Sequence, residues 1–92
     1  MESIMQAEKE CYLCGRQTGL ERHHVMSGTA DRKQAEKYGL WVWLCHECHL
    51  GNEGAQYNPV KAFTLKATAQ ELFEAKYGHQ KWMETFHRNY IY

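Results

Sequence analysis

The chain has 92 residues, of which 43% are hydrophobic and 24% are charged, a balance that is typical of a folded globular protein and excludes an extended disordered chain. Its formal charge is neutral, with 11 lysines and arginines against 11 acidic residues, so the net charge by itself predicts no polyanionic partner. We expect one domain, residues 1–92.

The first half of the chain predicts two short strands. Residues 1–10 form a polar lead-in with some helical character and no continuous apolar run, so we expect neither a signal peptide nor a membrane span, and a cytoplasmic location. Residues 20–26 are expected to form a short strand that ends before the Ser27-Gly28-Thr29 breaker. Residues 40–44 are expected to form a second strand, because they are aliphatic and aromatic without interruption after Gly39. Between them, residues 31–38 are expected to form a loop with at most a helical turn, ending at Gly39.

The second half of the chain predicts helices. Residues 46–53 should begin a short helix, and Pro59 suits the first turn of a longer one that ends at Gly78. Apolar residues at helical spacing predict core packing and not a cofactor site: Leu65, Ala69, Leu72, Phe73 and Tyr77, then Trp82, Met83, Phe86 and Tyr90. The predicted fold class is therefore α+β, with a core motif at residues 11–54 and a helical part at residues 59–90.

Four cysteines form two Cys-x2-Cys pairs, Cys11 with Cys14 and Cys45 with Cys48. In a reducing cytoplasm, thiolate ligands are expected more than disulfides. Two such turns supply the four soft ligands that a tetrahedral zinc ion needs, and a small core gains stability from a metal. We predict a structural Zn²⁺ site, which has no open position for chemistry; buried free thiols are the alternative.

Four of the six histidines lie on the predicted strand after the first pair or within and directly after the second pair: His23, His24, His46 and His49. His23 and His24 are neighbours on a predicted strand, so their side chains should point to opposite faces. We hypothesise that His23 and His49 hold a second, catalytic cation, while His24 acts as a general base and His46 faces solvent. A hard, oxygen-rich substrate would favour Mg²⁺ or Mn²⁺, and histidine ligation also admits Zn²⁺ or Ni²⁺.

Residues 11–54 resemble the HNH, or ββα-metal, endonuclease family, especially its small phage and prophage members. The resemblance is carried by three runs in the family's order: Cys11-Tyr-Leu-Cys14-Gly15, Leu20-Glu-Arg-His23-His24-Val25 and Leu44-Cys45-His-Glu-Cys48-His49. It implies a zinc-stabilised ββα-metal core and, for a phage-encoded protein, action inside a bacterial cell.

The resemblance also implies the roles of individual residues. By position, His23 and His49 match the metal-binding histidines and His24 matches the base that activates water. The family's middle asparagine, which orients the loop bearing the base, has no counterpart in residues 38–41. A further metal ligand is commonly found a few residues after the last histidine, and Asn52 and Glu53 are candidates, with exposed helix-end residues as the alternative. Glu53 would share a helix face with His49.

The expected activity is hydrolysis of phosphodiester bonds in DNA, as a nick or, if a homodimer forms, as a double-strand cut. Phosphate contacts are expected from Arg16, Arg22, Arg32 and Lys33, although a solvated surface would explain the same charges. Two alternatives remain open. One is an inactive zinc-stabilised module that binds nucleic acid or protein, and the other is a domain whose histidines complete a second structural zinc site.

Overall fold

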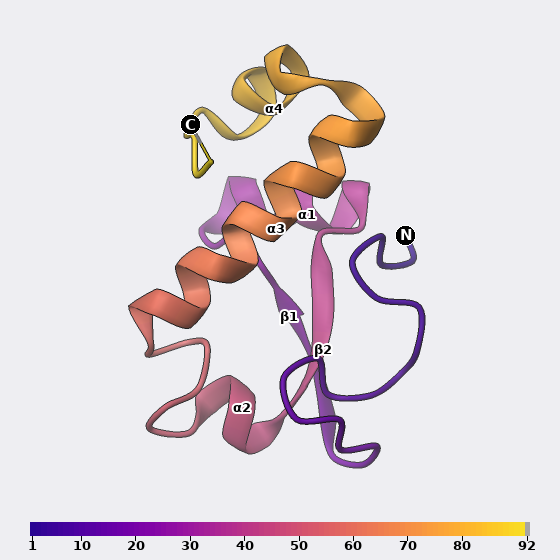
Figure 1. Cartoon of the computed structure of the whole chain (residues 1–92), viewed down its shortest axis with the longest axis vertical. Helices are drawn as coiled ribbons and strands as arrows, with labels where there is room; N and C mark the ends of the chain where they lie inside the picture. Colours follow the sequence, from indigo (N-terminus) through magenta and orange to yellow (C-terminus); the bar gives the residue numbers. More distant parts are fainter. Residues whose placement is uncertain (92) are drawn as a thin grey trace.

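The computed structural model describes residues 1–91 as a two-stranded antiparallel sheet with four helices (Figure 1). In chain order the elements are β1 (Leu20–His24), α1 (Thr29–Tyr38), β2 (Trp41–Cys45), α2 (His46–Leu50), α3 (Pro59–Tyr77) and α4 (His79–Phe86). The predicted α+β fold class is confirmed, and so are the two additional C-terminal helices, α3 and α4. None of the helices in the described part of the chain combines the length and the apolar character needed to cross a bilayer.

The register of the sheet determines which segments that flank the strands lie side by side. Leu20 lies opposite Cys45, and His24 lies opposite Trp41. Because the strands are antiparallel, the segment before β1 arrives beside the end of β2 and the start of α2. The first cysteine pair therefore reaches the second one through strand pairing.

The connection between the strands is a regular helix, and the prediction of a loop with at most a helical turn at residues 31–38 was wrong. Helix α1 has ten residues and ends at Gly39, whose φ of 74° is a left-handed conformation that suits glycine. A side chain at Gly39 would also collide with the backbone oxygen of Glu2. Residues 31–38 are rich in helix formers, and that composition outweighed the absence of a side-chain cap at Gly28.

The N-terminal segment follows the outer edge of β2 and is irregular, so the expected helical character of residues 1–10 was wrong (Figure 1). Its polar groups form hydrogen bonds with the backbone of β2 on the edge that does not pair with β1. The Ser3 hydroxyl donates to the carbonyl of Trp41, the Gln6 side chain accepts from the Trp43 N–H at 2.9 Å, and the Tyr12 N–H donates to the Trp43 carbonyl at 2.8 Å. These hydrogen bonds hold the segment alongside β2 and leave it without a helix.

One apolar core joins the sheet to the helices. Val42 and Leu44 of β2 are fully buried and belong to the same cluster as Phe73 of α3 and Trp82 of α4. The Phe73 and Trp82 rings meet edge to face, 5.4 Å apart. The predicted packing face of α3 is correct at Leu65, Ala69 and Phe73, whereas Leu72 and Tyr77 lie at its rim, 38% and 39% exposed.

Most helix and strand boundaries fall within two residues of the prediction. Helix α3 begins at Pro59, as expected, with the Asn58 side chain accepting from two backbone N–H groups of its first turn. Helix α2 begins at His46 and ends at Leu50, and Gly51 follows in an extended conformation, so the short helix expected to begin in residues 46–53 is confirmed. Tyr90 lies beyond the end of α4, where its N–H donates to the buried Gln70 side chain at 2.7 Å.

Candidate functional site

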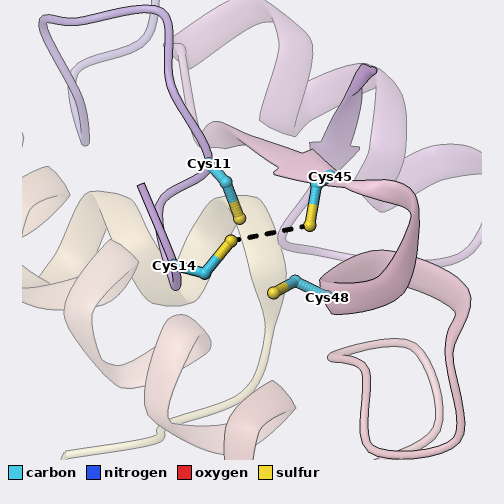
Figure 2. Close-up of side chains that lie close together, drawn as sticks. All are labelled: Cys11, Cys14, Cys45 and Cys48. Atoms are coloured by element: carbon cyan, nitrogen blue, oxygen red, sulfur yellow. Dashed lines mark hydrogen bonds between the residues drawn. The ribbon is translucent and has the colours of Figure 1, made fainter. Parts of the chain in front are cut away.

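The four cysteine sulfurs converge on one point (Figure 2). Cys11 and Cys14 come from the turn before β1, Cys45 ends β2, and Cys48 lies on α2. All four sulfur atoms lie within 4.8 Å of one another, and those of Cys14 and Cys45 are 3.7 Å apart. Sulfurs at the corners of a zinc tetrahedron, with bonds of about 2.3 Å, lie about 3.8 Å apart. The group could therefore coordinate a metal such as zinc.

Backbone groups support this arrangement by favouring a thiolate at one corner. Burial opposes ionisation of the Cys11 thiol, but backbone N–H groups of Cys45, Cys14 and Leu13 outweigh it and lower the pKa to about 6. For Cys48, burial and the neighbouring sulfurs raise the pKa well above that of a free thiol. Four thiols this close cannot all ionise without a cation between them, so the cluster suits a divalent metal.

His23 and His49 form a second pair of candidate ligands. His23 lies on β1 and His49 on α2, and their ring centroids are 5.0 Å apart in an edge-to-face arrangement. Burial, followed by the charges of His49, His24 and Lys66, lowers the pKa of His23 to about 4. His23 is therefore neutral near pH 7, the protonation state in which an imidazole binds a metal.

Glu21 sets the orientation of His49. Its Oε1 accepts a hydrogen bond from His49 Nδ1 at 2.8 Å, which leaves Nε2 as the nitrogen with a free lone pair. Hydrogen bonds from His49 and His46 lower the pKa of the Glu21 carboxyl, so it is an acceptor at neutral pH. His46 lies at the rim with its side chain 70% exposed, as expected.

The imidazoles border a surface pocket of about 350 Å³, which we call the histidine pocket. Its lining includes His23, His24, His49, Arg22 and Arg32. His23 and His24 are adjacent on β1 and have different partners, as the strand alternation predicts: His23 meets His49, whereas His24 meets Glu36 of α1. The pocket thus combines three imidazoles with two guanidinium groups.

His24 has a carboxylate partner. Its Nε2 lies 2.9 Å from Glu36 Oε1, and the same oxygen accepts from Arg22 at 2.8 Å. The hydrogen bond with His24, and then those with Arg22 and the amino group of Met1, lower the pKa of Glu36 to about 2 despite partial burial. Glu36 is therefore ionised across the whole neutral range.

Some predicted residues lie outside the histidine pocket. Glu53 follows the end of α2, so the prediction that it shares a helix face with His49 was wrong; its carboxylate accepts from Asn58 at 3.1 Å. Asn52 is exposed on the same turn, and Arg16 is exposed beside the first cysteine pair. Lys33 borders an adjacent pocket of about 400 Å³ with His24, Arg32 and Glu36.

Sequence reasoning missed both carboxylates that hold the imidazoles. Glu21 is two residues before His23 on β1, and residues two apart on a strand share a face, so its placement could have been anticipated. Glu36 could not have been, because the contact depends on α1 and on how α1 packs against β1. Both contacts link residues distant in sequence.

Comparisons with known proteins gave no relative: no family model, curated protein or solved structure matches the chain. The geometry of the chain itself is what bears on its function. That geometry is a small α+β fold, a four-cysteine cluster that could bind zinc, and a pocket lined with histidine and arginine.

Proposed function

We propose that the protein is a metal-dependent DNA endonuclease of the HNH, or ββα-metal, class, with a structural zinc ion in the cysteine cluster. One observation carries the proposal. His23 and His49, from β1 and α2, lie 5.0 Å apart between their ring centroids, and with His24 they line the same arginine-containing pocket. A pair of ligands, a base and positive charge are the groups that phosphodiester hydrolysis requires.

His23 and His49 would hold the catalytic cation. Both are suited to ligation, because His23 is neutral and His49 has its Nδ1 bonded to Glu21. Two protein ligands leave most of the coordination shell to water and substrate oxygens, as Mg²⁺ and Mn²⁺ prefer. A bound divalent cation would polarise the scissile phosphate and stabilise the leaving oxygen.

The remaining residues act directly on water and DNA. His24 is the general base that takes a proton from the attacking water, and general-base help is typically worth about 10²–10⁴-fold in rate. Arg22 and Arg32 border the pocket and would contact phosphates, which positions DNA without reading its sequence.

A second structural zinc site is a weaker explanation of the histidines. Among the described residues, the cysteine cluster is the only group of three or more histidine, cysteine or acidic side chains whose ligand atoms converge. A closed zinc site needs four protein ligands, and His23 and His49 supply two. The pair therefore suits an open, exchangeable site better than a structural one.

Cleavage of supercoiled plasmid DNA tests the proposal. Zinc-loaded protein with added Mn²⁺ or Mg²⁺ is expected to nick or linearise the plasmid, and chelation of the added ion should stop it. His24→Ala should fold and bind DNA but lose about 10²–10⁴-fold in cleavage rate. His87→Asn is the matched control: it removes an exposed imidazole outside the pocket and keeps a residue that tolerates the left-handed conformation at this helix end.

The alternative of a zinc-stabilised binding module predicts a different result. Such a protein would bind DNA, RNA or a protein partner and cut nothing with any added cation. Absence of cleavage by folded, zinc-loaded protein with Mg²⁺, Mn²⁺, Ni²⁺ or Zn²⁺ would reject the nuclease proposal in favour of the module. Cleavage that is equal in the wild type and in His24→Ala would remove His24 from the mechanism.

A further inference from the structure

Glu36 connects three groups at the edge of the histidine pocket. Its Oε1 lies 2.9 Å from His24 Nε2 and 2.8 Å from the Arg22 guanidinium, and its Oε2 lies 3.4 Å from the amino group of Met1. Arg22 is in turn stacked on Trp41, 3.8 Å from the ring centroid. The carboxylate is thus held from several directions, and it approaches His24 in one geometry.

This contact selects one form of the His24 ring. A neutral imidazole carries its proton on one nitrogen and accepts on the other. An ionised carboxylate can only accept, so the nitrogen that faces Glu36 must be the protonated one. That leaves Nδ1 of His24 with the lone pair, and among the described residues it has no protein hydrogen-bond partner.

The surroundings suit this arrangement to a reacting group. The His24 side chain is 12% exposed, so its ring is largely enclosed but reaches the pocket surface. His24 borders both the histidine pocket and the adjacent pocket that contains Arg32, Lys33 and Glu36. If the His24 ring could exchange freely between its two tautomers, Nδ1 would carry the lone pair, and so be able to accept a proton from water, for only part of the time.

We propose that Glu36 is the positioning residue of the general base: it holds His24 in the Nε2–H tautomer and so presents Nδ1 as the proton acceptor. The catalytic part of this inference rests on the proposed nuclease function, and the tautomer part does not. The contacts of Glu36 are with His24, Arg22 and the amino group of Met1. It acts only through His24, with Arg22 holding the carboxylate.

Nitrogen-15 NMR of the imidazole rings tests the tautomer without any cleavage. In zinc-loaded wild-type protein near pH 7.5, His24 is expected to show a protonated Nε2 and an unprotonated Nδ1. Glu36→Gln keeps an oxygen that can accept from Nε2–H, so it should retain much of this preference. Glu36→Ala should give a mixture of tautomers. Glu71→Ala on α3, an exposed carboxylate away from the pocket, is the matched control and should leave the His24 signals unchanged.

Cleavage kinetics test the catalytic consequence. Glu36→Ala is expected to lower kcat by roughly 10- to 100-fold, within the about 10²–10⁴-fold that a general base supplies, with a smaller change in KM for DNA. Glu36→Gln should recover part of the loss, which a pure charge effect would not produce, because glutamine restores the acceptor oxygen but not the charge. In a His24→Ala background, Glu36→Ala should cause no further loss, because the two residues act as one unit.

The possible failures are distinguishable. An Nδ1–H tautomer in the wild type, or identical tautomers in the wild type and Glu36→Ala, would overturn the positioning role even if DNA is cut. Equal losses from Glu36→Ala with and without His24 would overturn it as well. Absence of cleavage in the wild type would instead reject the nuclease and the catalytic part of this inference, while the NMR result still decides whether Glu36 orients the ring.

Discussion

Glu21 and His49 are 28 positions apart in the sequence, yet the carboxylate of Glu21 accepts a 2.8 Å hydrogen bond from Nδ1 of His49. The bond joins β1 to α2 across the same junction that brings the cysteine pairs together. It leaves Nε2 of His49 as the only nitrogen of that ring that can bind a cation, and it points that nitrogen in a defined direction.

Removing this carboxylate should weaken cation binding. We expect Glu21→Ala to lower the affinity of the His23–His49 pair for Mn²⁺ by roughly 10- to 100-fold, because an oriented imidazole becomes free to rotate. Titration of free Mn²⁺ by electron paramagnetic resonance measures this directly, with Glu71→Ala as the control. Unchanged Mn²⁺ affinity in folded Glu21→Ala would show that His49 is oriented by something other than Glu21.

The parts of the site that could be predicted from sequence have local signals. Two cysteines in a Cys-x2-Cys turn must lie on the same side of an ion wherever the turn folds, so the four-cysteine cluster was predicted correctly. The alternation of His23 and His24 follows from strand geometry alone. The meeting of His23 with His49 was also anticipated, from the position of His49 directly after the last cysteine.

The parts that could not be predicted depend on packing. Glu36 reaches His24 only because α1 is a full helix that lies against β1, and a segment of helix formers between strands does not reveal where its faces point. The prediction that Glu53 shares a helix face with His49 was wrong. It assumed that α2 continues past Gly51, whereas the chain turns there and Glu53 contacts Asn58 instead.

Zinc removal should unfold the protein. Structural zinc sites contribute about 10–16 kcal/mol of binding free energy, comparable with the whole stability of a small domain of about 5–15 kcal/mol. Metal analysis should find one tightly held zinc per chain, and a strong chelator should abolish the cooperative thermal transition seen by circular dichroism. Restoring Zn²⁺ should restore the transition. A chelated protein that melts at the same temperature would mean that the four thiols pack without a metal.

His23 should make the protein less stable in acid. Its pKa is about 4 in the fold and about 6.5 when unfolded, so between these values the unfolded chain binds more protons. Stability is therefore complete above pH 6.5 and falls as the pH drops toward 4.

Denaturant unfolding of zinc-loaded protein without other cations checks this, with His23→Gln, which cannot titrate, as the reference. The stability difference between wild type and His23→Gln should shift by roughly 1–2 kcal/mol against the wild type from pH 7.5 to pH 5. A difference that stays constant over this range would show that His23 remains accessible to protons in the fold.

Two exposed cations on α1 should account for part of the salt dependence of DNA binding. Arg32 and Lys33 border the pockets beside His24, and each phosphate that they neutralise releases counterions. Arg32→Ala with Lys33→Ala should weaken binding and lower the slope of log affinity against log salt by roughly 2. Lys81→Ala on α4, also exposed, is the matched control. An unchanged slope in the double variant would place the DNA elsewhere.

The bonds from Ser3, Gln6 and Tyr12 to β2 have a consequence for the metal-free chain. They cover the open edge of a strand, Trp41–Cys45, that consists of β-branched, aromatic and aliphatic residues and a cysteine. Tyr12 stays in place because Cys11 and Cys14 on either side of it belong to the cysteine cluster. If the turn comes loose, the uncovered strand can pair with the same strand of another molecule. If zinc is the ion that the cluster holds, the solubility of the chain would then depend on how promptly it acquires that ion.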